Sequence, residues 1–248
     1  MQPIPWDYAL ILSVLTIVVP WRGTVRIREL LAHPTLGASE RIAMYGSTIA
    51  FQWLAAILTA WRVLAREGGD PRLAAAVLGL SLPQPVTALV LGASLSLVLV
   101  CTQIASMRSL GRLPPGERGR LYEMAAKLMP QTRVELLPFF LLVCTVSFCE
   151  ELLYRGFAFL AFLQLFHGSI AAAIVGSSAI FAIGHLYQGR RGIATTFVLG
   201  AILAGMRAVT GSLAPCILVH FVVDFTAGLT GPHSVLRAKS AEDPATAA

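Results

Sequence analysis

Long apolar runs separated by short polar segments dominate the sequence. An α-helix rises about 1.5 Å per residue, so about twenty apolar residues cross the roughly 30 Å of hydrocarbon in a bilayer. Seven runs reach or approach this length, and they lie at residues 6–20, 42–65, 86–107, 135–166, 170–187, 193–209 and 213–229. The pattern therefore predicts an all-α fold, a polytopic membrane helix bundle with about seven transmembrane helices.

One shorter helix is expected between the second and third spans. Asp70 is a favourable N-cap, Pro71 suits the first helical position, and residues 73–80 supply an apolar stretch. The prolines within 82–85 are expected to end this short interfacial helix. The fourth span, at 135–166, is longer than a bilayer requires, so we expect it to be kinked or tilted.

The composition fits a membrane protein. Hydrophobic residues make up 56% of the chain and charged residues 13%, whereas soluble domains carry about 25% charged residues. The mean hydropathy is +0.73. We expect one integrated membrane domain, in which N-terminal helices and loops cover residues 1–133, a second group of helices covers 134–230 and a disordered cytoplasmic tail covers 231–248.

The basic residues indicate how the chain sits in the membrane. The net charge is +6, but the basic residues are spread between spans and do not cluster with aromatic residues on a polar face, so no nucleic-acid partner is expected. One side of the membrane collects Arg22, Arg26, Arg28, Arg41, Arg108, Arg112, Arg118, Arg120, Lys127, Arg133, Arg190, Arg191, Arg237 and Lys239. The other side holds only Arg62, Arg66, Arg72 and Arg207. Because Lys and Arg favour the cytoplasmic side, we expect the N-terminus outside and the C-terminus in the cytoplasm. Membrane lipids are expected partners, and the Ala- and Arg-rich composition favours a bacterial plasma (inner) membrane.

Six ionisable residues lie within the apolar spans and are candidates for a functional site. They are Glu150, Glu151 and Arg155 in the fourth span, His185 in the fifth, and His220 with Asp224 in the seventh. A charged group at the centre of a bilayer costs about 2.5–3.5 kcal/mol on insertion scales, so such residues are usually functional. Residues four apart share one face of a helix, which predicts a Glu151–Arg155 pair and a His220–Asp224 pair.

Three short motifs carry a resemblance to a known family. They are Glu-Glu-x-x-x-Arg at residues 150–155, Phe-x-x-x-His at 181–185, and His-x-x-x-Asp at 220–224, where the family has Asn or Asp. In this order, each within a span, they resemble the CPBP family (CAAX protease and bacteriocin-processing, or Abi) of intramembrane proteases, similar to the type II CAAX prenyl endopeptidases. The resemblance covers residues 136–229 and implies that 134–230 form a catalytic core.

The resemblance also implies roles for the site residues in a glutamic-type peptide hydrolysis. Glu150 would act as the general base on a water molecule that His185 helps to hold. Glu151 and Arg155 would form a charge-balanced support, and His220 with Asp224 would stabilise the oxyanion. An ionised Asp cannot donate a hydrogen bond, so we expect Asp224 either to be protonated or to orient His220. The expected substrate is a protein or peptide, membrane-associated or lipid-modified, that is cleaved near its C-terminus.

Other interpretations remain open from the sequence. A zinc site could use His185, His220 and Glu150, but the chain has no His-Glu-x-x-His motif, so we rank a metal-free mechanism with no cofactor above it. A non-catalytic membrane protein, for immunity or for transport, is the alternative outside the enzyme class, although transporter-like inverted repeats are not detectable. No feature of the sequence can be tied to a lipid, so prenylation of the substrate is left open, although a bacterial origin would favour an unprenylated substrate. The oligomeric state is also left open.

Overall fold

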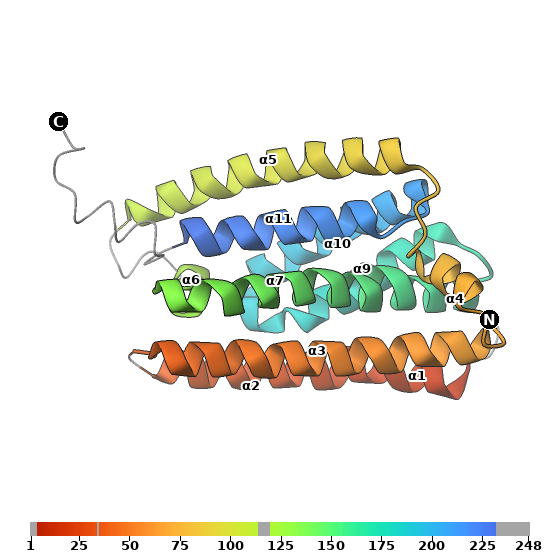
Figure 1. Ribbon diagram of the computed structural model, residues 1–248, viewed down its shortest axis with the longest axis horizontal. Coiled ribbons are helices and arrows are strands. Elements are labelled where there is room, and N and C mark those ends of the chain that lie inside the picture. The colour runs from red at the N-terminus through yellow and green to blue at the C-terminus, as the bar shows by residue number, and fades with distance from the viewer. Residues whose placement is uncertain (1–3, 34, 114–119, 232–248) are drawn as a thin grey trace.

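The computed structural model describes residues 4–33, 35–113 and 120–231, and in this part of the chain the secondary structure is helical with no strand (Figure 1). The predicted tail falls outside it except for Gly231. In chain order the elements are α1 (Trp6–Ser13), η1 (Val14–Val18), α2 (Val19–Ala32), α3 (Ala38–Arg66), α4 (Pro71–Leu78), α5 (Pro85–Gly111), α6 (Arg120–Leu128), η3 (Arg133–Glu135), α7 (Leu136–Glu151), η4 (Leu152–Ala158), α8 (Phe159–Leu165), α9 (Ile170–Gly184), η5 (Leu186–Gln188), α10 (Gly189–Thr210) and α11 (Ala214–Thr230).

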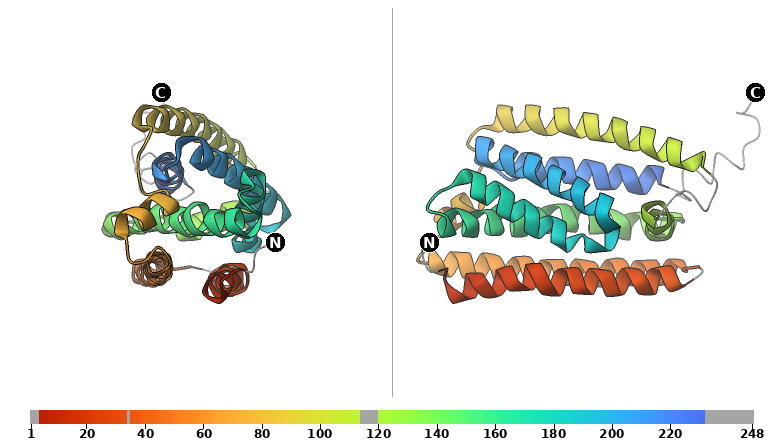
Figure 2. Two further views of the ribbon diagram at one scale, coloured as in Figure 1. Left: turned by 90° about the vertical axis from the view of Figure 1, so that its right-hand side faces the viewer. Right: turned by 180° about the vertical axis from the view of Figure 1, so that it is seen from behind.

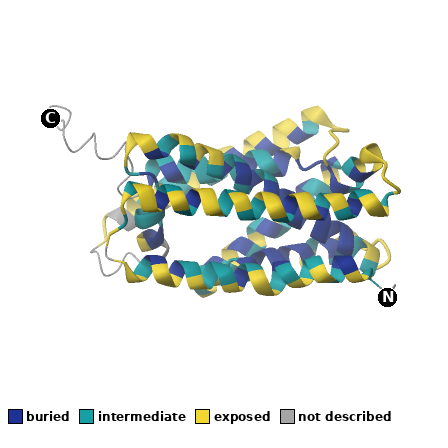
Figure 3. Cartoon of the chain, turned by 60° about the horizontal axis from the view of Figure 1, so that its bottom comes forward, coloured by how far each residue is buried: buried dark blue, intermediate teal, exposed yellow. Residues whose placement is uncertain are grey.

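The long helices run side by side as a layered bundle (Figures 1 and 2). Seen end-on in Figure 2, α5 and α11 lie above α7, and α3 lies beside the continuous helix α1–η1–α2 below it. α7 packs against both α3 and α11, so it is the central helix. Buried residues face the interior and exposed residues follow the outer faces (Figure 3). Many exposed residues are large and apolar, such as Trp21 and Leu97, as expected for a surface that faces lipid.

The number of spans is only partly confirmed. Within the described residues, five helical segments are long and apolar enough to cross a membrane: Trp6–Ala32, Ala38–Arg66, Pro85–Ser109, Arg133–Leu165 and Leu186–Thr210. The remaining two predicted spans correspond to α9 and α11, which are apolar but only 15 and 17 residues long. At about 1.5 Å per residue each is shorter than a full crossing. In the described residues the fold is an all-helical membrane bundle with five long apolar segments and two shorter apolar helices, so the predicted count of about seven spans is not confirmed.

The first span does not end at Pro20 as predicted. The helix continues from α1 through η1 into α2 and ends at Ala32. A proline normally interrupts a helix because it lacks the N–H that bonds to the carbonyl four residues back. Here a π-helical segment, η1, precedes Pro20 and has already widened the hydrogen-bonding pattern. Because the regular spacing of hydrogen bonds is already changed in η1, the missing N–H of Pro20 does not end the helix.

The predicted short helix is present as α4, with the expected N-cap. The Asp70 carboxylate accepts hydrogen bonds from the backbone N–H groups of Arg72 (2.8 Å) and Leu73 (3.3 Å). α4 ends earlier than predicted, because Gly79 adopts a left-handed conformation at φ 80°. It packs on η4, where a Cβ at Gly156 would lie 3.0 Å from the Leu78 carbonyl oxygen. A glycine at this position lets the two backbones approach.

One helix, α6, was not anticipated from the sequence. It lies across one end of the bundle, beside the start of α7 (Figures 1 and 2), and we call this the α6 end. The Lys127 ammonium donates to the carbonyls of Leu30 (3.2 Å) and Leu31 (3.1 Å) in the last turn of α2. The Tyr45 hydroxyl of α3 donates to the Leu128 carbonyl at 2.5 Å. α6 is therefore fastened to both helices that flank it.

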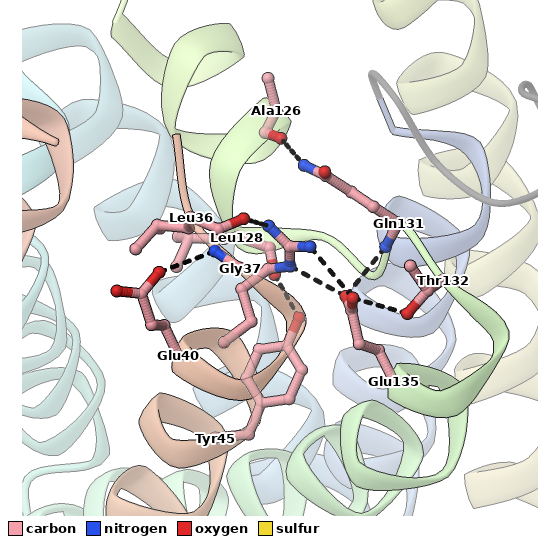
Figure 4. Close-up of polar contacts among 10 residues, drawn as sticks. Leu36, Gly37, Glu40, Tyr45, Ala126, Leu128, Gln131, Thr132 and Glu135 are labelled. Carbon is pink, nitrogen blue, oxygen red and sulfur yellow. Dashed lines mark hydrogen bonds and ion pairs between the residues drawn. The ribbon is translucent and has the colours of Figure 1, made fainter. Parts of the chain in front are cut away.

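A buried ion pair holds the connection between α6 and α7 (Figure 4). Arg41 donates from Nε and Nη2 to the two carboxylate oxygens of Glu135, at 2.9 and 3.0 Å. The same carboxylate accepts from the Gln131 backbone N–H (3.0 Å) and the Thr132 hydroxyl (2.7 Å). Bidentate pairs of this kind have a fixed geometry. Arg41, expected from the sequence only to mark the topology, thus fixes the start of the central helix.

Candidate active site

A cavity of about 440 Å³ opens among α2, α3, α6, α7, α11 and the end of α9. Four of the six predicted site residues line it: Glu150, His185, His220 and Asp224. Its other walls combine apolar side chains with polar ones, among them Arg22, Arg26, Thr48, Gln52 and Gln188. Two of the walls come from the N-terminal part of the chain: α2, which continues the first predicted span, and α3, which contains the second.

Glu150 lies in the cavity wall near the end of α7. Its Oε1 accepts a hydrogen bond from the Gln52 side-chain amide of α3 at 2.9 Å. This bond fixes the orientation of a half-buried carboxylate that faces open space. Gln52 was missed in the sequence analysis, because a single amide in an apolar span forms no motif. Its polarity within the span at 42–65 was the available signal.

The second glutamate belongs to a separate network behind the cavity. Glu151 Oε1 accepts from Arg155 Nη1 at 3.0 Å and lies 2.8 Å from His220 Nδ1. His220 Nε2 lies 3.4 Å from Asp224 Oδ2. Glu151 and Arg155 are fully buried, whereas 42% of the Asp224 side chain is exposed. The network therefore runs from a buried ion pair to the cavity wall.

The chemistry of His220 follows from these contacts. A carboxylate oxygen faces each of its ring nitrogens, and an imidazole donates to both only when it is protonated on both. Asp224 lies beside His220 Nε2, and its role in orienting His220 stays a prediction. An oxyanion could receive the Nε2–H in place of the more distant Asp224 oxygen.

Arg155 is held by an aromatic ring as well as by Glu151. Its guanidinium carbon lies 3.9 Å from the centre of the Phe181 ring, a cation–π contact that strengthens when water is excluded. Gly200 of α10 allows this packing, since a Cβ there would lie 3.4 Å from Arg155 Nη2. Arg155 itself sits in η4, a fully buried π-helical segment that begins directly after Glu151. Such segments are frequent at functional sites.

His185 follows the last residue of α9. Its Nδ1 lies 2.8 Å from the Phe181 carbonyl oxygen, and because a carbonyl only accepts, Nδ1 carries the hydrogen. In a neutral ring Nε2 then keeps its lone pair and can accept from a water molecule. Phe181, the first residue of the Phe-x-x-x-His motif, thus orients His185 with its backbone and covers Arg155 with its ring.

The residues of the zinc alternative do not converge. Among the described residues, no three His, Cys, Asp or Glu side chains are placed to share a metal ion. Glu150 is bonded to Gln52 and His220 to Glu151, so each points to a different partner. The arrangement instead offers one oriented carboxylate and one oriented imidazole in the same cavity. Such a pair can position and deprotonate a water molecule.

Comparison with known proteins supports the resemblance carried by the three motifs. Residues 132–226 match the family model described as Type II CAAX prenyl endopeptidase Rce1-like. The matched segment runs from the start of α7 into α11 and contains all six predicted site residues. No curated protein and no solved structure matches the chain. The family prediction is confirmed for this segment, which is less than half of the chain.

Proposed function

We propose that this chain, whose residues 132–226 belong to the Rce1-like family of type II CAAX prenyl endopeptidases, is a glutamic-type intramembrane endopeptidase. The observation that carries the proposal is the shared cavity of Glu150 and His185, in which a separate hydrogen bond orients each side chain. Both lie in a helical bundle whose long helices are apolar enough to cross a membrane.

In the proposed reaction, Glu150 takes a proton from a water molecule that His185 Nε2 holds. The hydroxide attacks the carbonyl carbon of the scissile peptide bond, and the carbonyl oxygen becomes negatively charged. Asp224 orients His220 before the reaction, and His220 Nε2–H then donates to the oxyanion in place of the Asp224 oxygen while Glu151 holds the ring at Nδ1. Glu150 then passes its proton to the leaving amine as the C–N bond breaks. Preorganised donors of this kind stabilise the charge that develops in the transition state.

Glu151 and Arg155 have a supporting part in this proposal. The Glu151 carboxylate orients His220 through Nδ1, and the Arg155 guanidinium balances the charge of the carboxylate. Neither lines the cavity, so neither is proposed to touch the substrate. Replacing Glu151 or Arg155 would therefore lower activity by disturbing the orientation of His220.

The proposed substrate is a membrane-associated or lipid-modified protein or peptide that is cleaved near its C-terminus. The α6 end carries Lys127, Arg133 and the end of α5 with Arg108 and Arg112, so we place it in the cytoplasm by the positive-inside rule. The cavity reaches toward this end, where α6 forms part of its wall. A substrate would therefore be engaged from the cytoplasmic half of what we propose is a bacterial plasma membrane.

The test uses the full chain in proteoliposomes with two peptide libraries. One library carries an S-farnesylated cysteine four residues from the end, and the other carries the same cysteine unmodified. Products are identified by mass spectrometry. We expect cleavage by the wild type and a loss of at least about a hundredfold in Glu150→Gln and His185→Ala, because general-base catalysis contributes roughly 10²–10⁴-fold. Glu29→Gln, at an exposed glutamate of α2, is the matched control and should keep full activity.

Two results would overturn the proposal. Full activity in Glu150→Gln would exclude the glutamate as base. Activity lost to a chelator and restored by zinc would contradict the metal-free mechanism. If the wild type is correctly inserted and cleaves neither library, the result would count against a protease and favour a non-catalytic protein for immunity or transport.

A further inference from the structure

We propose that Arg22 and Arg26, in the α2 wall of the cavity, bind the terminal carboxylate of the substrate. This inference rests on the proposed peptidase function and adds the group by which the enzyme recognises the substrate end.

The two arginines lie one helical turn apart and reach across to α3. Arg26 donates from Nη1 to the Thr48 hydroxyl at 3.4 Å, and its Nη2 contacts the Ser47 hydroxyl. Arg22 donates from Nη2 to the Ser47 carbonyl at 3.4 Å, and its guanidinium lies 4.1 Å from the centre of the Phe51 ring. Both are partly buried and line the same cavity as Glu150. Two guanidinium groups are thus held together at one place in its wall.

Within the ranges that the structure describes, Arg22 and Arg26 have no carboxylate partner, although four other arginines of the bundle do. Arg207 of α10 also has none there, but it does not line the cavity. Arg41 pairs with Glu135, and Arg155 pairs with Glu151. Arg62 and Arg66 share the buried carboxylate of Asp7, at 2.7 and 2.5 Å.

Among the described residues, no ion pair is made by Arg22 or Arg26, and their contacts are with neutral oxygens or a ring. Guanidinium groups bind carboxylates with two parallel hydrogen bonds, more strongly than they bind neutral acceptors. The site is therefore open to an anion that the described part of the chain does not supply.

Helix α3 gives the spacing between this site and the reacting group. Thr48 contacts Arg26, and Gln52, four residues further along α3, contacts Glu150. Four residues correspond to about 6 Å along a helix, and an extended peptide covers about 3.3–3.6 Å per residue. A carboxylate at Arg26 would thus end a peptide about two residues beyond the bond at Glu150. This fits an enzyme that releases a very short C-terminal peptide.

An alternative explanation is that Arg22 and Arg26 only anchor α2 at the membrane surface. Arg28, two residues further along the helix, is exposed and does not line the cavity, so it suits that role. It also provides a matched control, because Arg28→Gln removes the same charge from the same helix.

The experiment compares two versions of whichever library the wild type cleaves, one ending in a carboxylate and one in an amide. We expect the wild type to prefer the carboxylate by about ten- to a hundredfold in kcat/KM, the range for a hydrogen bond to a charged group. Arg26→Gln should lose this preference through slower cleavage of the carboxylate form alone, and Arg22→Gln should lose part of it. Arg28→Gln should keep the wild-type ratio.

Equal rates for the two libraries in the wild type would overturn the inference while leaving the proposed function in place. So would an Arg26→Gln variant that retains the preference. The wild-type ratio needs no variant, and the amide library reports whether each variant is still an active, folded enzyme. Failure of the wild type to cleave either library would instead count against the proposed function itself.

Discussion

Replacing Gln52 by leucine tests whether α3 positions the glutamate at the centre of the site. The Gln52 amide donates to Glu150 Oε1 at 2.9 Å, and it is the one hydrogen bond recorded for that carboxylate within the described residues. Leucine has a similar size but no donor, so the change removes the bond without opening a large cavity. Glu150 would keep its charge and lose its fixed orientation.

The expected magnitude follows from the strength of such a bond. A hydrogen bond to a charged group contributes about 1.5–3 kcal/mol, and each 1.36 kcal/mol in the barrier changes a rate about tenfold. We therefore expect kcat to fall by about ten- to a hundredfold in Gln52→Leu. KM should change little, because Gln52 acts on the base and is not proposed to bind the substrate.

The assay measures initial rates on the cleaved library in proteoliposomes, across a range of substrate concentrations. Gln164→Leu, at an exposed glutamine of α8 that does not line the cavity, is the matched control. A wild-type kcat in Gln52→Leu would refute the positioning role. A rise in KM with unchanged kcat would assign Gln52 to substrate binding instead.

Three further predictions concern the framework of the site. Arg155→Met should lower the free energy of unfolding by up to about 3–5 kcal/mol, because the buried Glu151 carboxylate loses its guanidinium partner and keeps only His220. Thermal unfolding in detergent measures this, and the double variant Glu151→Gln/Arg155→Met should recover part of the loss. Arg41→Met should speed hydrogen exchange at residues 129–135 and not in α9, since Glu135 loses its bidentate partner; unchanged exchange would contradict the role given to this pair. Gly156→Ala should cost about 1–3 kcal/mol, because its Cβ would lie 3.0 Å from the Leu78 carbonyl oxygen, whereas Gly205→Ala, which meets nothing within 4 Å, should cost nothing.

The chemistry of the site could be anticipated from the sequence more fully than its walls. Glu150 and Glu151 differ by about 100° around a helix of 3.6 residues per turn, which correctly separates the cavity-facing carboxylate from the one paired with Arg155. Both could be recognised as candidate site residues because they are charged and lie in an apolar span. Gln52, Arg22 and Arg26 lie far from the motifs in sequence, and only the packing of α2 and α3 around α7 brings them to the cavity.

Two helical features escaped prediction for physical reasons. The continuation of the first helix past Pro20 depends on a π-helical segment, and apolar periodicity does not distinguish π-helix from α-helix. α6 is short and mostly polar on one face, so it has no membrane-span pattern, and its position depends on Lys127 and the Arg41–Glu135 pair. Long-range polar contacts of this kind leave no local signal in the sequence.

The shortness of α9 has a consequence for which proteins such an enzyme would admit. With 15 residues, α9 ends alongside the interior of the first helix, where Tyr187 lies close to Gly23, nine residues before the end of α2. His185 is consequently recessed by roughly 13 Å from that end, at 1.5 Å per residue. Only a narrow, unfolded chain end can reach this depth through a cavity of about 440 Å³. Folded domains at the membrane surface would be too large to enter and would not be cleaved, whatever their amino-acid sequence.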